Sequence, residues 1–281
     1  DSITISANGT LDAPDASGSL TLNGTKSAWS FQNNSTNFNH NNGTITQTAA
    51  GHIKSVSSNP MYNFTLNSAT SDSHEAVFRP KTGTDCVIAA NNVTVTRGVV
   101  KLNTVSHNAS MGSLTIGSAG TFQASSGTTT ITAETASHAW KNDGGTFTHN
   151  SGKVKIFDAD GTVMGSTNVK ETTFYDLEMS LFANTMTCSF FDADGSNAVT
   201  ILNNLDITKG EMEFSTASDT ITIHGLTKIT SNGAFSDNAA HDTNKIIHNG
   251  LVTNEGTYNI NDNTTVKMNG GIRNLGTITV K

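Results

Sequence analysis

The chain has 281 residues, a formal net charge of −7 and only 14% charged residues, against roughly 25% in an ordinary globular protein. It contains no cluster of Lys or Arg, which excludes the electrostatic surface that binding to nucleic acid or to an anionic membrane requires. It also contains no run of about 18 apolar residues, so we expect no membrane insertion.

Thr, Asn, Ser and Gly take the place of the missing charged residues, a composition that suits an extracellular setting. Hydrophobic residues still make up 35% of the chain, and they recur at every second position within short runs, as half-buried strands require. No longer window has apolar residues at helical spacing. The sequence therefore predicts a folded, all-β protein with almost no helix.

A long repeat organises the chain. The stretch AWSFQNNSTNFNHN, which begins at Ala28, resembles AWKNDGGTFTHN, which begins at Ala139. Aligning Trp29 with Trp140, and continuing outward, gives two units of about 111 residues. We divide the chain into closing coils of a partial unit (1–27), repeat one (28–138), repeat two (139–238) and terminal coils (239–281).

A shorter period lies inside each repeat. Val93 and Leu114 are separated by about 21 residues, as are Leu205 and Leu226, and each begins a short run of β-forming residues. The pattern predicts a single elongated parallel β-helix, or β-solenoid, with about thirteen coils of about 21 residues. We expect Gly and Asn at the turns, and Asn in successive coils can form side-chain ladders.

Three stretches depart from the regular pattern. The chain starts at Asp1 rather than Met, which predicts a processed product or an excised segment. Residues 67–85 hold the densest charge of repeat one and predict a projecting loop. Both extremes of the chain have strand-like sequence without a helical cap, so we expect the solenoid ends to pair with the same protein or with other virion or surface proteins.

The two cysteines, Cys86 and Cys188, lie at positions of the two repeats that do not correspond. About five coils separate them, which places them too far apart for a disulfide bond. We expect lone thiols that are buried or half-buried.

The motifs GTFTHNSGKV and TFYDLEM of repeat two, with FNHNNGTI and MYNFTL of repeat one, carry a resemblance to a known family. This family consists of β-solenoid repeats found in phage virion proteins and in large bacterial surface proteins, and the resemblance covers nearly the whole chain. It implies the architecture, and it implies stalks, fibres, decorations or adhesins as functions. No catalytic residues accompany the motif in that family.

The sequence FDADG occurs twice and supplies four candidate calcium ligands, since carboxylates at alternate positions before a Gly begin many calcium loops. The remaining ligands of such a loop are missing, so a plain acidic turn is the favoured interpretation and no other cofactor is expected. The candidates are Asp158, Asp160, Asp192 and Asp194.

Two other sets of residues could suggest catalysis. His40 and His149 occupy equivalent positions, which favours turn histidines bonded to a neighbouring coil, because catalysis needs one site rather than one per repeat. Glu211 and Glu213 point to the same side of a strand, as paired carboxylates of glycan-cleaving enzymes do, but a solvated edge fits their spacing equally. Motifs for nucleophiles, phosphate loops and zinc are absent.

We therefore expect a non-enzymatic structural protein of an extracellular assembly, located in a virion or at a cell surface. A phage decoration, appendage or fibre protein comes first, on the resemblance. A secreted bacterial adhesin or filament subunit is the alternative, and a tail-spike-like carbohydrate-active protein is the third. A cell-surface glycan is a further partner to consider.

Overall fold

The computed structural model describes residues 2–23, 29–54, 59–79, 85–102, 107–132, 138–158, 161, 166–169, 171–190, 197–214, 218–237 and 243–280. These residues form an all-β parallel solenoid of about 10 turns of roughly 23 residues, and none of them is helical. The predicted fold class is thus confirmed. Within these ranges no helix is long and apolar enough to span a bilayer.

Short strands follow one another along the chain. Those of the first half are β1 (Ile3–Ile5), β2 (Thr10–Asp12), β3 (Ser19–Leu22), β4 (Trp29–Asn33), β5 (Asn37–Asn39), β6 (Thr44–Gln47), β7 (Gly51–Lys54), β8 (Asn63–Asn67), β9 (Glu75–Phe78), β10 (Cys86–Lys101), β11 (Ala109–Gln123), β12 (Thr128–Ile131), β13 (His138–Asn142) and β14 (Thr146–Thr148). Those of the second half are β15 (Lys153–Phe157), β16 (Ser166–Val169), β17 (Thr173–Phe174), β18 (Asp176–Ser180), β19 (Thr187–Ser189), β20 (Ala198–Ile201), β21 (Leu205–Phe214), β22 (Thr220–Ile223), β23 (Thr227–Ile229), β24 (Gly233–Asp237), β25 (Lys245–His248), β26 (Val252–Asn254), β27 (Thr257–Ile260), β28 (Thr265–Met268), β29 (Ile272–Asn274) and β30 (Thr277–Val280).

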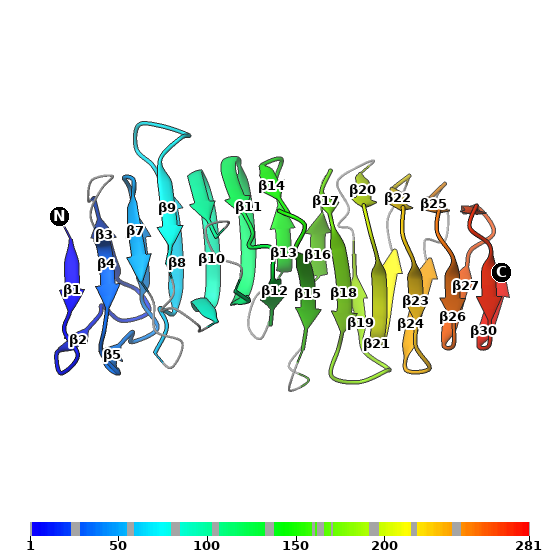
Figure 1. Ribbon diagram of the computed structural model, residues 1–281, viewed down its shortest axis with the longest axis horizontal. Coiled ribbons are helices and arrows are strands. Elements are labelled where there is room, and N and C mark those ends of the chain that lie inside the picture. The colour runs from blue at the N-terminus through cyan, green and yellow to red at the C-terminus, as the bar shows by residue number, and fades with distance from the viewer. Residues whose placement is uncertain are drawn as a thin grey trace. The chain divides into compact units, whose positions relative to one another are not determined.

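The solenoid divides into two compact units. The N-terminal unit comprises Asp1–Thr130 with Asn142–Gly152, and the C-terminal unit comprises Ile131–Lys141 with Lys153–Lys281. Within each unit, strands of successive coils lie side by side and pair in parallel (Figure 1). The last coil has three strands, β28, β29 and β30, which pair in parallel with β25, β26 and β27 of the preceding coil.

The coils are longer and more variable than predicted. In the C-terminal unit, Leu205 pairs with Thr227, Thr227 with Val252 and Val252 with Ile272, so successive coils differ in length. These differences in coil length arise from loops of different length between strands that otherwise match. The prediction of about thirteen shorter coils is wrong, and the structure has about 10 turns of roughly 23 residues.

One predicted strand pairing is right and another is shifted by one position. Val93 pairs with Leu114, as the short period indicated. Leu205 pairs with Thr227 rather than with Leu226, whose side chain is 54% exposed. Because side chains alternate between the faces of a strand, this shift places Thr227 inside and Leu226 outside. The Thr227 hydroxyl is satisfied by His248 Nδ1 at 2.8 Å.

The interior of the C-terminal unit holds a ladder of aromatic rings. Neighbouring centroids lie 5.1–6.5 Å apart, within the range of favourable ring packing. Every ring in the ladder is at most 1% exposed, and a fully buried side chain of this size contributes about 1.5–3 kcal/mol. The members are Trp140, Phe174, Phe190, Phe214, Phe235 and Tyr258.

Stacked glycines form two corners of the last coils. A Cβ on Gly250 would lie 2.0 Å from the Gly225 carbonyl oxygen, and one on Gly256 would lie 2.1 Å from that of Gly233. No side chain fits where backbones approach this closely. Gly270 and Gly276 continue the two corners in the next coil, where a Cβ would lie 2.2 Å from the Gly250 carbonyl carbon and 2.1 Å from the Gly256 carbonyl oxygen, respectively.

The predicted Asn ladders are present between successive coils. Asn269 donates to Asn249 Oδ1 at 2.8 Å, and Asn254 donates to Asn274 Oδ1 at 2.7 Å.

One set of hydrogen bonds between neighbouring coils occurs at equivalent positions in both repeats. Asn63 Oδ1 accepts bonds from the Asn91 side chain and the Asn92 backbone, and Asp176 Oδ1 accepts the same two bonds in repeat two.

The structure changes one anchor of the predicted alignment. Strands β4 and β13 have the same burial pattern, and within it Trp140 matches Phe31, not Trp29. Both Phe31 and Trp140 are fully buried. Trp29 is half-buried and corresponds to His138, so the offset between the repeats here equals the offset between His40 and His149. The two tryptophans were aligned wrongly because Trp29 lies two positions before Phe31, the aromatic residue that Trp140 matches.

The predicted loop at 67–85 is interrupted by a strand. Residues 68–74 form a turn that projects between β8 and β9 (Figure 1), after which β9 returns to the solenoid with Ala76 and Phe78 fully buried. Residues 80–84 lie outside the described ranges. The buried Ala76 and Phe78 place EAVF in a strand of the solenoid, although charged residues surround this stretch. The prediction of one continuous loop is therefore wrong.

Candidate functional site

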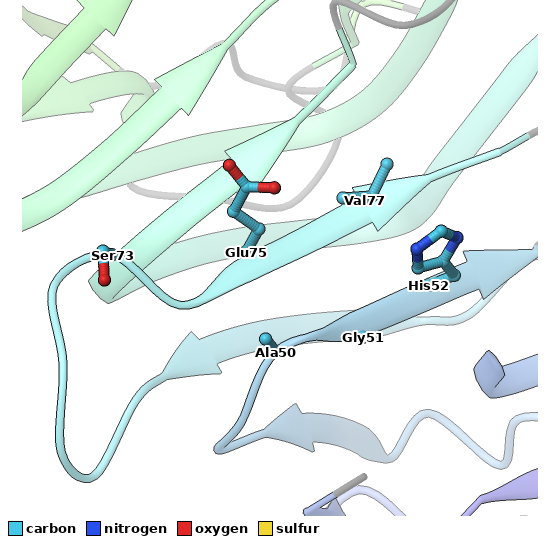
Figure 2. A pocket seen from close by; sticks show the side chains of 6 residues that line it. All are labelled: Ala50, Gly51, His52, Ser73, Glu75 and Val77. Atoms are coloured by element: carbon cyan, nitrogen blue, oxygen red, sulfur yellow. The ribbon is translucent and has the colours of Figure 1, made fainter. Parts of the chain in front are cut away.

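The outward face of the N-terminal unit contains a hollow of about 370 Å³. It lies where β7 and β9 run side by side, with His52 paired to Val77. Figure 2 shows the His52, Glu75 and Val77 side chains on the same side of these strands. The lining residues are Ala50, Gly51, His52, Ser73, Glu75 and Val77.

Period-two alternation positions the polar groups of this hollow. Along β7, Gly51 and Ile53 are buried while His52 is half-exposed. Along β9, Ala76 and Phe78 fill the interior, which turns the side chain of Glu75 outward. The arrangement therefore depends on the buried residues of the same strands.

His52 lies between an aromatic ring and charged groups. The Trp29 ring packs edge-on against the imidazole, with centroids 5.9 Å apart. Burial is the main cause that lowers the pKa of His52. The positive charge of Arg79 lowers it further, while Glu75 opposes both. A lowered pKa favours the neutral imidazole, which carries one donor and one acceptor nitrogen.

The Glu75 carboxylate is held by a lysine from the next coil. Lys101 Nζ lies 3.1 Å from Glu75 Oε1, and both side chains are partly exposed. Lys101 is itself paired with Val77, and Gln123 is paired with Lys101. A row of outward polar side chains thus continues from the hollow across the following coils.

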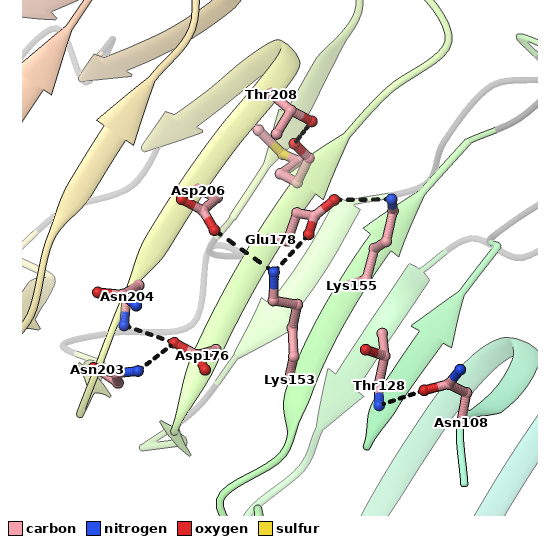
Figure 3. Close-up of polar contacts among 11 residues, drawn as sticks. Asn108, Thr128, Lys153, Lys155, Asp176, Glu178, Asn203, Asn204, Asp206 and Thr208 are labelled. Carbon is pink, nitrogen blue, oxygen red and sulfur yellow. Dashed lines mark hydrogen bonds and ion pairs between the residues drawn. The ribbon is translucent and has the colours of Figure 1, made fainter. Parts of the chain in front are cut away.

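A second polar cluster lies on the outer face of the C-terminal unit (Figure 3). Lys153 and Lys155 of β15 each contact a Glu178 oxygen at 2.8 Å, and Lys153 Nζ also lies 3.6 Å from Asp206 Oδ2. Burial alone would raise the pKa of Glu178, but hydrogen bonds from the two lysines hold it below its usual value. Partly exposed pairs of this kind contribute about 0–1 kcal/mol each. The cluster joins three neighbouring strands, a structural role.

Only one of the four predicted calcium ligands can be placed. Asp158 follows β15 and is 3% exposed, and its Oδ1 accepts a hydrogen bond from the Gly161 backbone at 3.0 Å. Asp160, Asp192 and Asp194 lie outside the described residues. The described part of the chain brings no three His, Cys, Asp or Glu side chains together in a metal-binding arrangement.

The two predicted turn histidines share one geometry. His40 Nδ1 accepts a bond from the Asn42 backbone at 3.0 Å, and His149 Nδ1 accepts one from Ser151 at 3.0 Å. These bonds are within each turn, not to a neighbouring coil as predicted. The contact of His40 with the next coil is its ring stack on Tyr62, at 5.1 Å. Burial lowers the pKa of both histidines.

The remaining predicted residues are located as follows. Glu211 and Glu213 both point outward from β21, as expected, and Glu211 accepts a hydrogen bond from Thr187 at 2.9 Å. Cys86 and Cys188 are buried and not joined in a disulfide, as predicted. Burial raises the pKa of Cys86 to about 12, with a further contribution from Asp85.

Sequence reasoning missed both polar clusters on the outer face. Their signal was present: Glu75 in EAVF and Lys153 and Lys155 in KVKIF occupy the outward positions of alternating runs. What the sequence lacked was the pairing register, which decides which outward side chains of different coils become neighbours.

The fold defines the chain as a parallel β-solenoid of repeated coils. A scan of protein-family models and searches of curated proteins and of solved structures found no match to it. The further assignment therefore depends on the residues themselves.

Proposed function

We propose that this chain is a non-enzymatic structural component of an extracellular assembly, most specifically a phage virion decoration, appendage or fibre protein. The repeat motifs around His40 and His149 support its membership in the family of virion and surface β-solenoids described above. The low charge content supports a virion or cell-surface location. A bacterial adhesin or filament subunit is the alternative.

The observation that carries the proposal is the surface of the coil formed by β28, β29 and β30. Four large apolar side chains of this coil are exposed, whereas Val252 and Tyr258, which pair with Ile272 and Ile278, are fully buried. The exposed fractions are 38% for Ile272, 64% for Leu275, 38% for Ile278 and 69% for Val280. We infer that another β-coil covers this surface and adds parallel strands to it.

The geometry favours a coil of the same type as the occupant. Asn274, whose Oδ1 accepts from Asn254, lies at a position where a further Asn would extend the ladder. Strand addition supplies backbone hydrogen bonds, and burial of the four apolar side chains adds about 25 cal/mol per Å². The inference holds whether the covering coil belongs to another molecule or to further residues of a longer polypeptide.

The location can be tested by immunogold electron microscopy with an antibody against the purified chain. We expect gold at regular positions on virions or on surface filaments. Label confined to the cell interior would contradict the proposal. Degradation of host glycans by the purified chain would instead favour the carbohydrate-active candidate.

The assembly surface can be tested with the double variant Leu275→Lys and Val280→Lys. Leu226→Lys is the matched control, because Leu226 is also exposed but directly precedes β23, which is paired on both sides. We expect the double variant to lose incorporation into the particle or filament, while the control retains it. Equal incorporation of both variants would show that this coil is not an interface.

A further inference from the structure

The hollow between β7 and β9 has properties that the structural role does not require. Its volume of about 370 Å³ lies within the range of roughly 300–1,000 Å³ that is typical of small-ligand sites. A solenoid that served only as a scaffold would not require a concave outer face lined by polar side chains. We propose that this hollow binds a carbohydrate, with Glu75, His52 and Ser73 as the polar contacts. This proposal goes beyond the structural role and does not depend on it.

The polar groups suit the hydroxyls of a sugar. The carboxylate of Glu75 accepts hydrogen bonds, the imidazole of His52 both donates and accepts, and the Ser73 hydroxyl does the same. Adjacent hydroxyl groups of a sugar ring offer donors and acceptors in matching pairs. Ser73 is already oriented by the Ser71 hydroxyl at 2.8 Å.

The apolar part of the hollow suits the C–H face of a sugar ring. Ala50, Gly51 and Val77 present only small groups, and the half-buried Trp29 ring packs against His52 at the neighbouring coil. An aromatic ring beside polar groups is an amphipathic surface, apolar on its face and hydrogen-bonding at its rim.

The charge balance favours a neutral saccharide. Lys101 Nζ lies 3.1 Å from Glu75 Oε1, so the charge of this carboxylate is compensated by its own ion pair. Glu75 repels an anion that approaches the hollow, and Arg79, close enough to lower the pKa of His52, disfavours a cation. A neutral, hydroxyl-rich ligand is repelled by neither Glu75 nor Arg79.

The row of outward side chains extends the site beyond one sugar. Lys101 pairs with Val77, and Gln123 with Lys101, so the row advances by about 4.8 Å per coil. A saccharide chain laid across the strands would meet a new polar side chain at each coil. We therefore expect oligosaccharides to bind more tightly than the corresponding monosaccharides.

The test uses a printed array of bacterial and animal glycans as the probe, followed by titration of each retained oligosaccharide. The chain has two tryptophans, of which Trp140 is fully buried and Trp29 packs against His52, a residue that lines the hollow. Trp29 fluorescence in a Trp140→Phe background reports binding at this place. Saturation-transfer NMR on the parent chain gives the same answer if that background folds poorly.

Glu75→Gln and His52→Ala are the test variants, and Glu211→Gln is the matched control, since Glu211 also points outward from a strand but does not line this hollow. We expect saturable binding by the parent and the control, with a Kd of about 1 mM or tighter, and affinity at least about tenfold weaker in each test variant. Retention of no glycan by the parent would overturn the proposal. Undiminished binding by both test variants would also overturn it.

Discussion

The turns of the two repeats are almost identical, whereas their outward side chains differ. In repeat one, Asn41 and Asn42 have φ values of 46° and 60°, and in repeat two Asn150 and Ser151 have 47° and 60°. Asn41 and Asn150 each donate to a carbonyl of the neighbouring coil at 2.7 Å. By contrast, Trp29 faces outward where repeat two has His138.

This difference shows which positions the solenoid constrains. A turn must reverse the chain within one coil spacing and satisfy its backbone groups, which limits both φ and residue type. An outward side chain must only be compatible with water and with its neighbours. Sites with individual function are therefore expected on the outer face, where the hollow beside His52 lies.

The largest expected effect is at a corner formed by stacked glycines, where the backbones of successive coils lie too close for a side chain. Gly256→Ala should destabilise the C-terminal unit by about 3 kcal/mol or more, because its Cβ would lie 2.1 Å from the Gly233 carbonyl oxygen. Gly271→Ala is the control: φ is +80° but no atom lies within 4 Å, so about 1 kcal/mol is expected. Urea denaturation measures both, and equal losses would contradict the role of close approach.

A buried histidine should respond to pH more strongly than the turn histidines. His248 is fully buried, with Nδ1 2.8 Å from Thr227 Oγ1 and Nε2 2.9 Å from the Tyr258 hydroxyl. Burial lowers the pKa of His248 from 6.5 to about 4. Below pH 6.5 the unfolded chain takes up a proton that the native chain refuses, so stability falls until the native histidine also protonates near pH 4.

The loss over this window should reach about 3 kcal/mol, at 1.36 kcal/mol per unit of pKa. Subtracting the pH profile of His248→Gln from that of the parent isolates this contribution from those of His40 and His149. Parallel profiles between pH 7 and pH 4 would show that His248 does not carry the effect.

The shared connection at Asn63 and Asp176 tests whether the repeats are interchangeable. Asp176→Asn should cost less than about 1 kcal/mol, because Asn63 makes the same two bonds without a charge. Asp176→Ala should cost about 2 kcal/mol, since it leaves the donors of Asn203 and Asn204 without their acceptor. If thermal denaturation shows equal losses for both variants, the charge rather than the acceptor geometry holds this connection.

The smallest expected effect is at the turn itself. Ser151→Asn should stabilise the chain by about 0.5 kcal/mol, since Asn tolerates a positive φ better than Ser does. The reciprocal change, Asn42→Ser, should destabilise by a similar amount. Differential scanning calorimetry measures both, and a shift of the same sign in the two variants would contradict the equivalence of the turns.

The sequence by itself determined the all-β class, the absence of helix from the described residues and the repeated turns. These properties follow from local rules: period-two alternation places Phe31 and Ile53 inside, and Asn and Gly permit the backbone conformations of the turns. The Val93–Leu114 pairing also followed, because both residues begin runs with the same alternation.

Only the tertiary structure decided the coil length, the register and the outer face. Leu226 and Thr227 are adjacent, and either could have paired with Leu205. In the structure Thr227 is the inward residue and forms a hydrogen bond with His248, a contact that no local pattern encodes. In the same way, His52, Glu75 and Lys101 lie in three successive coils, so their proximity depends on the register of β7, β9 and β10. A one-residue slip would send these side chains inward, which is why the sequence pattern alone could not reveal the hollow.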